Sequence, residues 1–220
     1  MMETANSAGF ELKGGHPALD LVNTLDNRFR KHGCVELLGE YADLLRFARQ
    51  TKLLSARHAS LLAGAANGGA AGRGVATQAL ESARELREAA AAALYAAVDG
   101  RAPAAAAIRI LERHFLRASR HRRLRWNQSA KRSSTPAGAS WVWERSETEL
   151  ALPAWMLAHA VSDLMTSTIL GRLRACGSET CRWLFLDTSK NHTRRWCDMK
   201  ICGNRMKARR LHARRQGHAS

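Results

Sequence analysis

Apolar residues recur at helical spacing through most of the first 120 residues. Between residues 37 and 54 they form one stripe of a helix: Leu37, Tyr41, Leu44, Leu45 and Ala48. Ser55 can cap a following helix that reaches Leu62. A longer helix is predicted over 75–98, and Pro103 fits the first turn of another helix that continues through Phe115.

Glycines and alternating residues predict the non-helical parts. The stretch 64–74 holds many glycines, which predicts a flexible turn or loop. Residues 123–126 and 141–145 alternate between apolar and polar and are joined by a polar stretch, so they predict a short β-hairpin. Pro153 then opens a long helix that reaches about Arg174. This helix is apolar over much of its circumference, so we expect it near the centre of the core.

The charge of the chain is strongly positive and unevenly distributed. The 220 residues include 35 Lys and Arg against 19 Asp and Glu, a formal net charge of +16. Residues 171–220 hold thirteen Lys and Arg against three acids, and residues 113–132 hold eight with no acid. Two basic zones on a nearly neutral body predict a polyanionic partner, with nucleic acid first. The alternative for 113–132 is a solvated basic face.

The composition also narrows the class of protein. The chain has 45% hydrophobic residues, and none of its apolar runs approaches the eighteen or so residues that a membrane span needs. This composition predicts a soluble globular protein. Its first fifteen residues lack the basic and then apolar layout of a secretory signal. We therefore expect a cytoplasmic protein.

Four of the five cysteines form two pairs with the same spacing. Cys176 and Cys181 make one C-x4-C pair, and Cys197 and Cys202 make the other. Four thiolates satisfy one tetrahedral Zn²⁺, and because such a site has no open position the zinc is expected to be structural. Two disulfides, an iron–sulfur cluster, or His192 in place of one cysteine are the alternatives. Cys34 is expected to be a small buried hydrophobe.

The cysteine segment resembles the zinc finger named for its Cys-Gly-Asn-Arg motif, CGNR. The motif stands here at 202–205, and the matching flanks are Trp183–Asp187, Thr188-Ser189 and Arg194–Cys197. In that family the module follows a helical N-terminal domain called ABATE, which often begins with a segment that Leu19–Thr24 resembles. The resemblance implies a stress-related transcription regulator. It also implies two domains, an ABATE-like domain over 1–170 and the zinc finger over 171–220.

The expected fold is therefore mainly α, with a helical N-terminal domain, a small β-hairpin, and a small C-terminal zinc module that ends in a basic helix. Residues 204–216 contain good helix formers and few large apolar residues, so this helix has little reason to be buried. Basic residues here could read bases in the major groove or contact phosphates. The candidate DNA-binding residues are Arg194, Arg195, Arg205, Lys207, Arg209, Arg210 and Arg214.

The N-terminal domain offers one candidate site. If Asp20, Asn23 and Asn27 share a helix face, they could line a pocket for a small effector; the alternative is that Asp20 caps a helix and Asn23 satisfies a buried backbone group. The chain carries none of the common catalytic signatures, so no catalytic residue and no enzyme activity are expected. Two other functions stay open. One is an RNA-binding accessory protein that stacks Trp126, Trp141 and Trp143 on bases, and the other an enzyme whose zinc is purely structural.

Overall fold

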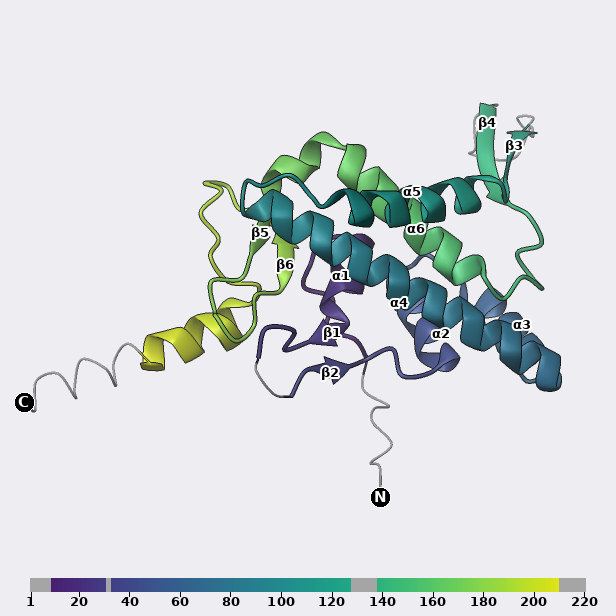
Figure 1. Ribbon diagram of the computed structural model, residues 1–220, viewed down its shortest axis with the longest axis horizontal. Coiled ribbons are helices and arrows are strands. Elements are labelled where there is room, and N and C mark those ends of the chain that lie inside the picture. Colours follow the sequence, from purple (N-terminus) through teal and green to yellow (C-terminus); the bar gives the residue numbers. More distant parts are fainter. Residues whose placement is uncertain (1–8, 31–32, 128–137, 210–220) are drawn as a thin grey trace, which may run out of the picture.

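The protein is mainly helical, as expected (Figure 1). The computed structural model describes residues 9–30, 33–127 and 138–209. Its α-helices are α1 (Pro17–Asn23), α2 (Tyr41–Gln50), α3 (Ala56–Ala66), α4 (Ala70–Val98), α5 (Ala105–Ser119) and α6 (Leu152–Thr166). A 3-10 turn, η1 (Thr168–Arg172), and a π-helical turn, η2 (Met199–Gly203), occur near the C-terminal end.

Three long helices form the centre of the molecule. The helices α4, α5 and α6 pack against one another, and the shorter α1 and α2 pack against α4 and α6 (Figure 1). The buried face of α4 is rich in alanine, which allows its neighbours to approach closely. Nine of the fifteen residues of α6 are buried, as its apolar circumference predicted.

Among the described residues, six short strands pair into three antiparallel ribbons. The pairs are β1 (Leu25–Asp26) with β2 (Val35–Glu36), β3 (Arg122–Asn127) with β4 (Gly138–Trp143), and β5 (Leu173–Ala175) with β6 (Leu184–Leu186). The β3–β4 hairpin is the one expected from the alternating residues, and its connection lies outside the described residues. Across the described part of the chain, no helix has the length and apolarity needed to cross a membrane.

The glycine-rich stretch 64–74 contains a turn, as predicted, but the turn is much shorter than the stretch. Helix α3 continues to Ala66, a turn occupies 67–69, and α4 begins at Ala70. Gly69 has φ +118°, a conformation that other residues rarely adopt. A Cβ at Gly72 would lie 2.5 Å from the carbonyl oxygen of Ala65. The glycines therefore allow two helices to meet at a tight corner.

Several helix ends also differ from the prediction. Helix α2 begins at Tyr41, not Leu37, because the Asp43 carboxylate accepts hydrogen bonds from the amides of Gly39 and Glu40 and fixes the start there. Helix α5 begins two residues after Pro103. Helix α6 ends at Thr166 instead of Arg174, because Ser167 is extended and residues 173–175 pair as a strand with β6.

Candidate metal centre

Two turns bring the four paired cysteines to one point. Cys176 follows β5 and Cys181 precedes β6, so the hairpin between these strands presents both thiols. Cys197 lies two residues before η2, and Cys202 lies within it. The four Sγ atoms all lie within 4.8 Å of one another.

Hydrogen bonds donated by backbone amides fix each turn. In the first, the amide of Cys181 donates to the carbonyl of Ser178 at 3.0 Å. In the second, the carboxylate of Asp198 accepts from the amides of Lys200 at 2.7 Å and Ile201 at 3.2 Å. The amide of Gly177 donates to the carbonyl of Arg195 at 2.8 Å and joins the two turns. The cysteines are thus positioned by the fold of the module itself.

The arrangement of the sulfurs fits one zinc ion. Cys181 Sγ lies 3.5 Å from Cys197 Sγ, which lies 3.7 Å from Cys202 Sγ. A tetrahedron with Zn–S distances of about 2.3 Å has S···S edges of about 3.8 Å, whereas a disulfide has an S–S bond of about 2.05 Å. Cys176, Cys197 and Cys202 are buried and Cys181 is half-buried. The sulfur separations confirm the predicted zinc site and exclude disulfides between these cysteines.

Strand β6 is shared between the metal centre and the main core. Successive side chains of a strand point to opposite faces. Leu184 and Leu186 face the main core with Leu173, while Phe185 is fully buried among the cysteines. The metal centre therefore shares one of its walls with the helical body.

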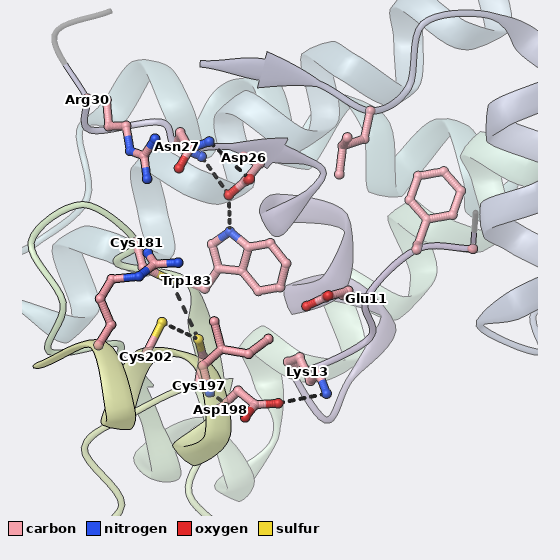
Figure 2. A pocket seen from close by; sticks show the side chains of 15 residues that line it. Glu11, Lys13, Asp26, Asn27, Arg30, Cys181, Trp183, Cys197, Asp198 and Cys202 are labelled. Carbon is pink, nitrogen blue, oxygen red and sulfur yellow. Dashed lines mark hydrogen bonds and ion pairs between the residues drawn. The ribbon is translucent and has the colours of Figure 1, made fainter. Parts of the chain in front are cut away.

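Polar contacts join the module to the N-terminal residues, and one pair of them bears out the alternative in which Asn23 satisfies buried backbone groups. Asn23 makes two hydrogen bonds to the backbone of Leu184, each 2.9 Å long. The indole of Trp183 donates to Asp26 at 2.9 Å, and Lys13 pairs with Asp198 at 2.8 Å (Figure 2). These contacts span up to 185 positions in sequence, so no local pattern could reveal them.

The candidate DNA-binding residues occupy different environments. The guanidinium of Arg194 lies inside the module, where it donates to the carbonyls of Trp196 and Cys197 and lies 4.4 Å from the ring centre of Phe185. Four others are exposed: Arg195, Arg205, Lys207 and Arg209. Residues 204–209 are helical and continue directly from η2. Arg210 and Arg214 lie outside the described residues.

A cavity of about 500 Å³ lies between the module and the N-terminal residues (Figure 2). Three of the cysteines and Trp183 form one side, and Lys13, Asp26, Asn27 and Arg30 are among the residues of the other. Arg205 also lines it. Of the three candidate effector residues, only Asn27 contributes to this cavity. Asn23 is buried against β6, and the carboxylate of Asp20 accepts a hydrogen bond from the amide of Gly14.

Asp20 has an unusual electrostatic environment. The N-cap of α1 is His16, and the buried carboxylate of Asp20 accepts from the amide of Gly14 at 2.7 Å. Burial raises the pKa of Asp20 from its usual 3.8 to about 6, although hydrogen bonds from Gly14 and Lys13 oppose the change. The folded protein therefore holds this proton more tightly than the unfolded chain does.

Replacing Asp20 with asparagine should remove a pH-dependent part of the stability. Between pH 4 and 6 the folded protein retains a proton that the unfolded chain loses, so this contribution to the free energy of unfolding falls as pH rises and is gone above pH 6. The Asp20→Asn variant should therefore gain stability relative to the wild type over that range, by up to roughly 3 kcal/mol. Urea unfolding at pH 4, 5, 6 and 7 measures the difference, and a constant difference would contradict the assignment.

The structure corrects one further cysteine prediction. Cys34 is exposed, not buried, because it lies next to β2 at the surface of the β1–β2 ribbon, whose residues Val35 and Glu36 are both exposed. The apolar neighbours that suggested burial follow it in sequence at Leu37 and Leu38.

Two models of known protein families match the chain. A family model for ABATE, described as "Putative stress-induced transcription regulator", matches residues 15–168. A model for the CGNR zinc finger matches residues 172–215. No curated protein matches the chain.

Proposed function

Because the chain belongs to the ABATE family of stress-induced transcription regulators and carries a CGNR zinc finger, we propose that it regulates transcription by binding duplex DNA through its zinc module. In this proposal residues 1–170 form the domain that receives a signal, and residues 171–220 form the DNA-binding domain. The zinc ion is structural, since four cysteines complete its coordination.

The proposal is supported by the position of the basic helix, which begins directly after the cysteine cluster. Cys202 is a zinc ligand candidate, and the helical residues 204–209 start two positions later. Arg205, Lys207 and Arg209 all lie exposed along this segment. A metal ion that fixes the first turn of an exposed basic helix gives that helix a defined orientation, which is what insertion into a major groove requires.

Helical spacing separates two roles among these residues. Arg205 and Arg209 stand four positions apart and so share one side of the helix, whereas Lys207 lies on another side. Arginine bonded in bidentate fashion to guanine is the most frequent specific contact in the major groove, so we assign base reading to Arg205 and Arg209. Lys207 and Arg195 are assigned to phosphates. Arg194 supports the module from within, since its guanidinium is occupied by backbone carbonyls.

Replacing Arg209 with alanine should weaken binding to the preferred duplex by about 5- to 150-fold and relax selectivity at one base pair. The measurement is a competition titration of a selected binding sequence against its single-base variants. Arg109→Ala is the matched control, because it removes an exposed arginine from α5. An equal loss for every sequence would make Arg209 a phosphate contact, and no loss for any duplex would contradict the proposed function.

The cavity beside the zinc site is the proposed point of signal input. It is lined by residues of both parts of the chain, including Arg205 of the basic helix, so a ligand bound there would contact the DNA-binding element directly. An occupant that holds Arg205 should lower affinity for DNA. The wall residue Trp183 provides a reporter, since its indole N–H gives a separate NMR signal that Trp183→Phe identifies.

Small molecules that move the Trp183 signal should also lower DNA affinity. Those that bind elsewhere and leave that signal unchanged serve as the control. If ligands of the cavity leave the affinity for duplex DNA unchanged, the cavity is not the regulatory site.

A further inference from the structure

The cavity beside the cysteine cluster holds two arginines whose side chains have no partner. Arg30 follows β1, Arg205 belongs to the helical residues 204–209, and both line the cavity. Both are exposed, and across the described residues neither guanidinium makes an ion pair or a hydrogen bond. Figure 2 shows Arg30 extending from the N-terminal segment toward the zinc module. Because a guanidinium carries several N–H donors and one positive charge, the cavity presents two unused cationic groups from opposite ends of the chain.

The remaining charged side chains of the cavity are already engaged. Asp198 pairs with Lys13 at 2.8 Å and also accepts from two backbone amides of its own turn. Asp26 accepts from the indole N–H of Trp183 at 2.9 Å. The pKa of Lys13 is raised chiefly by Asp198 and further by Glu11, so this one ammonium interacts with both acids. The two arginines are therefore the charges left for a ligand.

The zinc cluster adds negative charge but leaves the donors of the arginines available. Cys181, Cys197 and Cys202 line the cavity, and four thiolates around one Zn²⁺ carry a net negative charge. Within the part of the chain that the structure describes, no hydrogen bond joins Arg30 or Arg205 to a cysteine sulfur. Two of these three cysteines are buried, whereas both arginines are exposed. The cluster therefore attracts the guanidinium groups at long range without occupying them.

The wall of the cavity also offers a fixed aromatic surface. Trp183 is half-buried, and the hydrogen bond from its indole to Asp26 sets the orientation of the ring. The apolar residues Phe10, Leu37 and Ile201 line the same cavity, and Ile201 is 43% exposed. An aromatic ring packs well on an indole face, so an occupant with a flat apolar body would cover this wall.

We propose that the cavity binds a small aromatic carboxylate. Arg30 and Arg205 hold its carboxylate from two sides, and its ring packs against Trp183. The planar fork of a guanidinium matches the two oxygens of a carboxylate, which makes such pairs both strong and directional. The volume of about 500 Å³ is within the usual range for small-molecule sites. Bound in this way, the ligand joins the N-terminal segment to the basic helix.

The consequence for DNA rests on the function proposed above, whereas the binding of the carboxylate does not. Arg205 is one of the two residues assigned to base reading, and a carboxylate bound to it would cancel its charge and occupy its donors. The ligand should therefore compete with duplex DNA for Arg205. Since coupling between two ligands is reciprocal, duplex DNA should weaken the binding of the carboxylate to the same degree.

The test uses naphthoate as the probe and the full-length, zinc-loaded protein. A titration followed by the indole N–H NMR signal of Trp183 should show a saturable shift. Two analogues of similar shape, the neutral naphthylmethanol and the cationic naphthylmethylammonium, should bind at least about tenfold more weakly, because they cannot form charge-assisted hydrogen bonds with guanidinium groups. Tighter binding of the ammonium compound would overturn the proposal and assign the cavity to the negative charge of the zinc cluster and Glu11.

Arg30→Ala should weaken the binding of naphthoate by about tenfold or more, since it removes a hydrogen-bonded charge. Arg30 is exposed, so the variant should keep the wild-type melting temperature. Arg109→Ala is the matched control, because this exposed arginine of α5 does not line the cavity. Equal affinity for naphthoate in Arg30→Ala and the wild type would overturn the proposal, as would equal binding of all three naphthyl compounds.

Measurements with duplex DNA separate this inference from the proposed function. Saturating naphthoate should lower the duplex affinity of the wild type and of Arg109→Ala, and the same concentration should lower that of Arg30→Ala less. Naphthoate binding that depends on Arg30 in a protein without any duplex affinity would support the carboxylate site and refute the proposed function. Duplex binding in a protein that does not bind naphthoate would do the reverse.

Discussion

Replacing Cys202 with serine is expected to abolish tight zinc binding and unfold the C-terminal module. Cys202 is buried, and its Sγ lies 3.7 Å from that of Cys197. A structural zinc ion contributes an apparent 10–16 kcal/mol in small zinc-finger modules, roughly equal to the whole stability of a typical domain. The second, smaller core around Phe185 consists largely of the cysteines themselves, so little else remains to hold the turns in place.

The loss should be measured as zinc content by atomic absorption together with limited proteolysis. The variant should contain little zinc and be cleaved rapidly within residues 176–209. Because β6 is shared with the main core, the amide of Leu186, which donates to the carbonyl of Gly14 at 2.9 Å, should also exchange faster. Cys34→Ser removes an exposed thiol and should behave as wild type. Full zinc content with wild-type resistance in Cys202→Ser would refute the four-cysteine site.

The second large effect is expected for Asn23→Ala. The Asn23 side chain donates to the carbonyl of Leu184 and accepts from its amide, and all of these groups are buried. Alanine would leave two backbone groups without partners, each of which costs about 1–3 kcal/mol. The free energy of unfolding should therefore fall by roughly 2–6 kcal/mol, which corresponds to a melting temperature lower by about 4–24 °C.

Urea unfolding of this variant tests the structural role of Asn23 directly. Asn27→Gly is the control. Asn27 has φ +54°, a conformation that glycine tolerates, and its side chain bonds only to the neighbouring Asp26. It should change stability little. Wild-type stability in Asn23→Ala would mean that the two hydrogen bonds to Leu184 contribute little to folding. The Asn23 amide would then be available to an effector, as the effector interpretation requires.

Local patterns were sufficient where the determinants of structure are local. The hairpin followed from alternating residues, the cap of α3 from Ser55, and the zinc site from cysteine spacing. Each of these depends on residues within a few positions, or on a metal whose geometry is known in advance. The mainly helical fold followed for the same reason.

The failures come from contacts between distant segments. Glycines at 69 and 72 suggested a loop, yet they permit the close corner between α3 and α4. Leu173 extends the apolar pattern of α6, but residues 173–175 pair as a strand with residues 184–186. The contacts of Asn23, Trp183 and Lys13 with their partners join the two ends of the chain.

Under the proposed function, zinc holds the basic helix in the orientation that binding to duplex DNA requires. The most direct measurement is the affinity of the zinc-loaded protein for a random-sequence duplex over a salt series, by fluorescence anisotropy. We predict a steep linear fall of log K with log salt, with a slope near −0.9 per phosphate contacted, and loss of most of this binding in Cys202→Ser. Duplex affinity that is equal in the wild type and in Cys202→Ser, or absent from both at low salt, would show that zinc does not organise a DNA-binding helix.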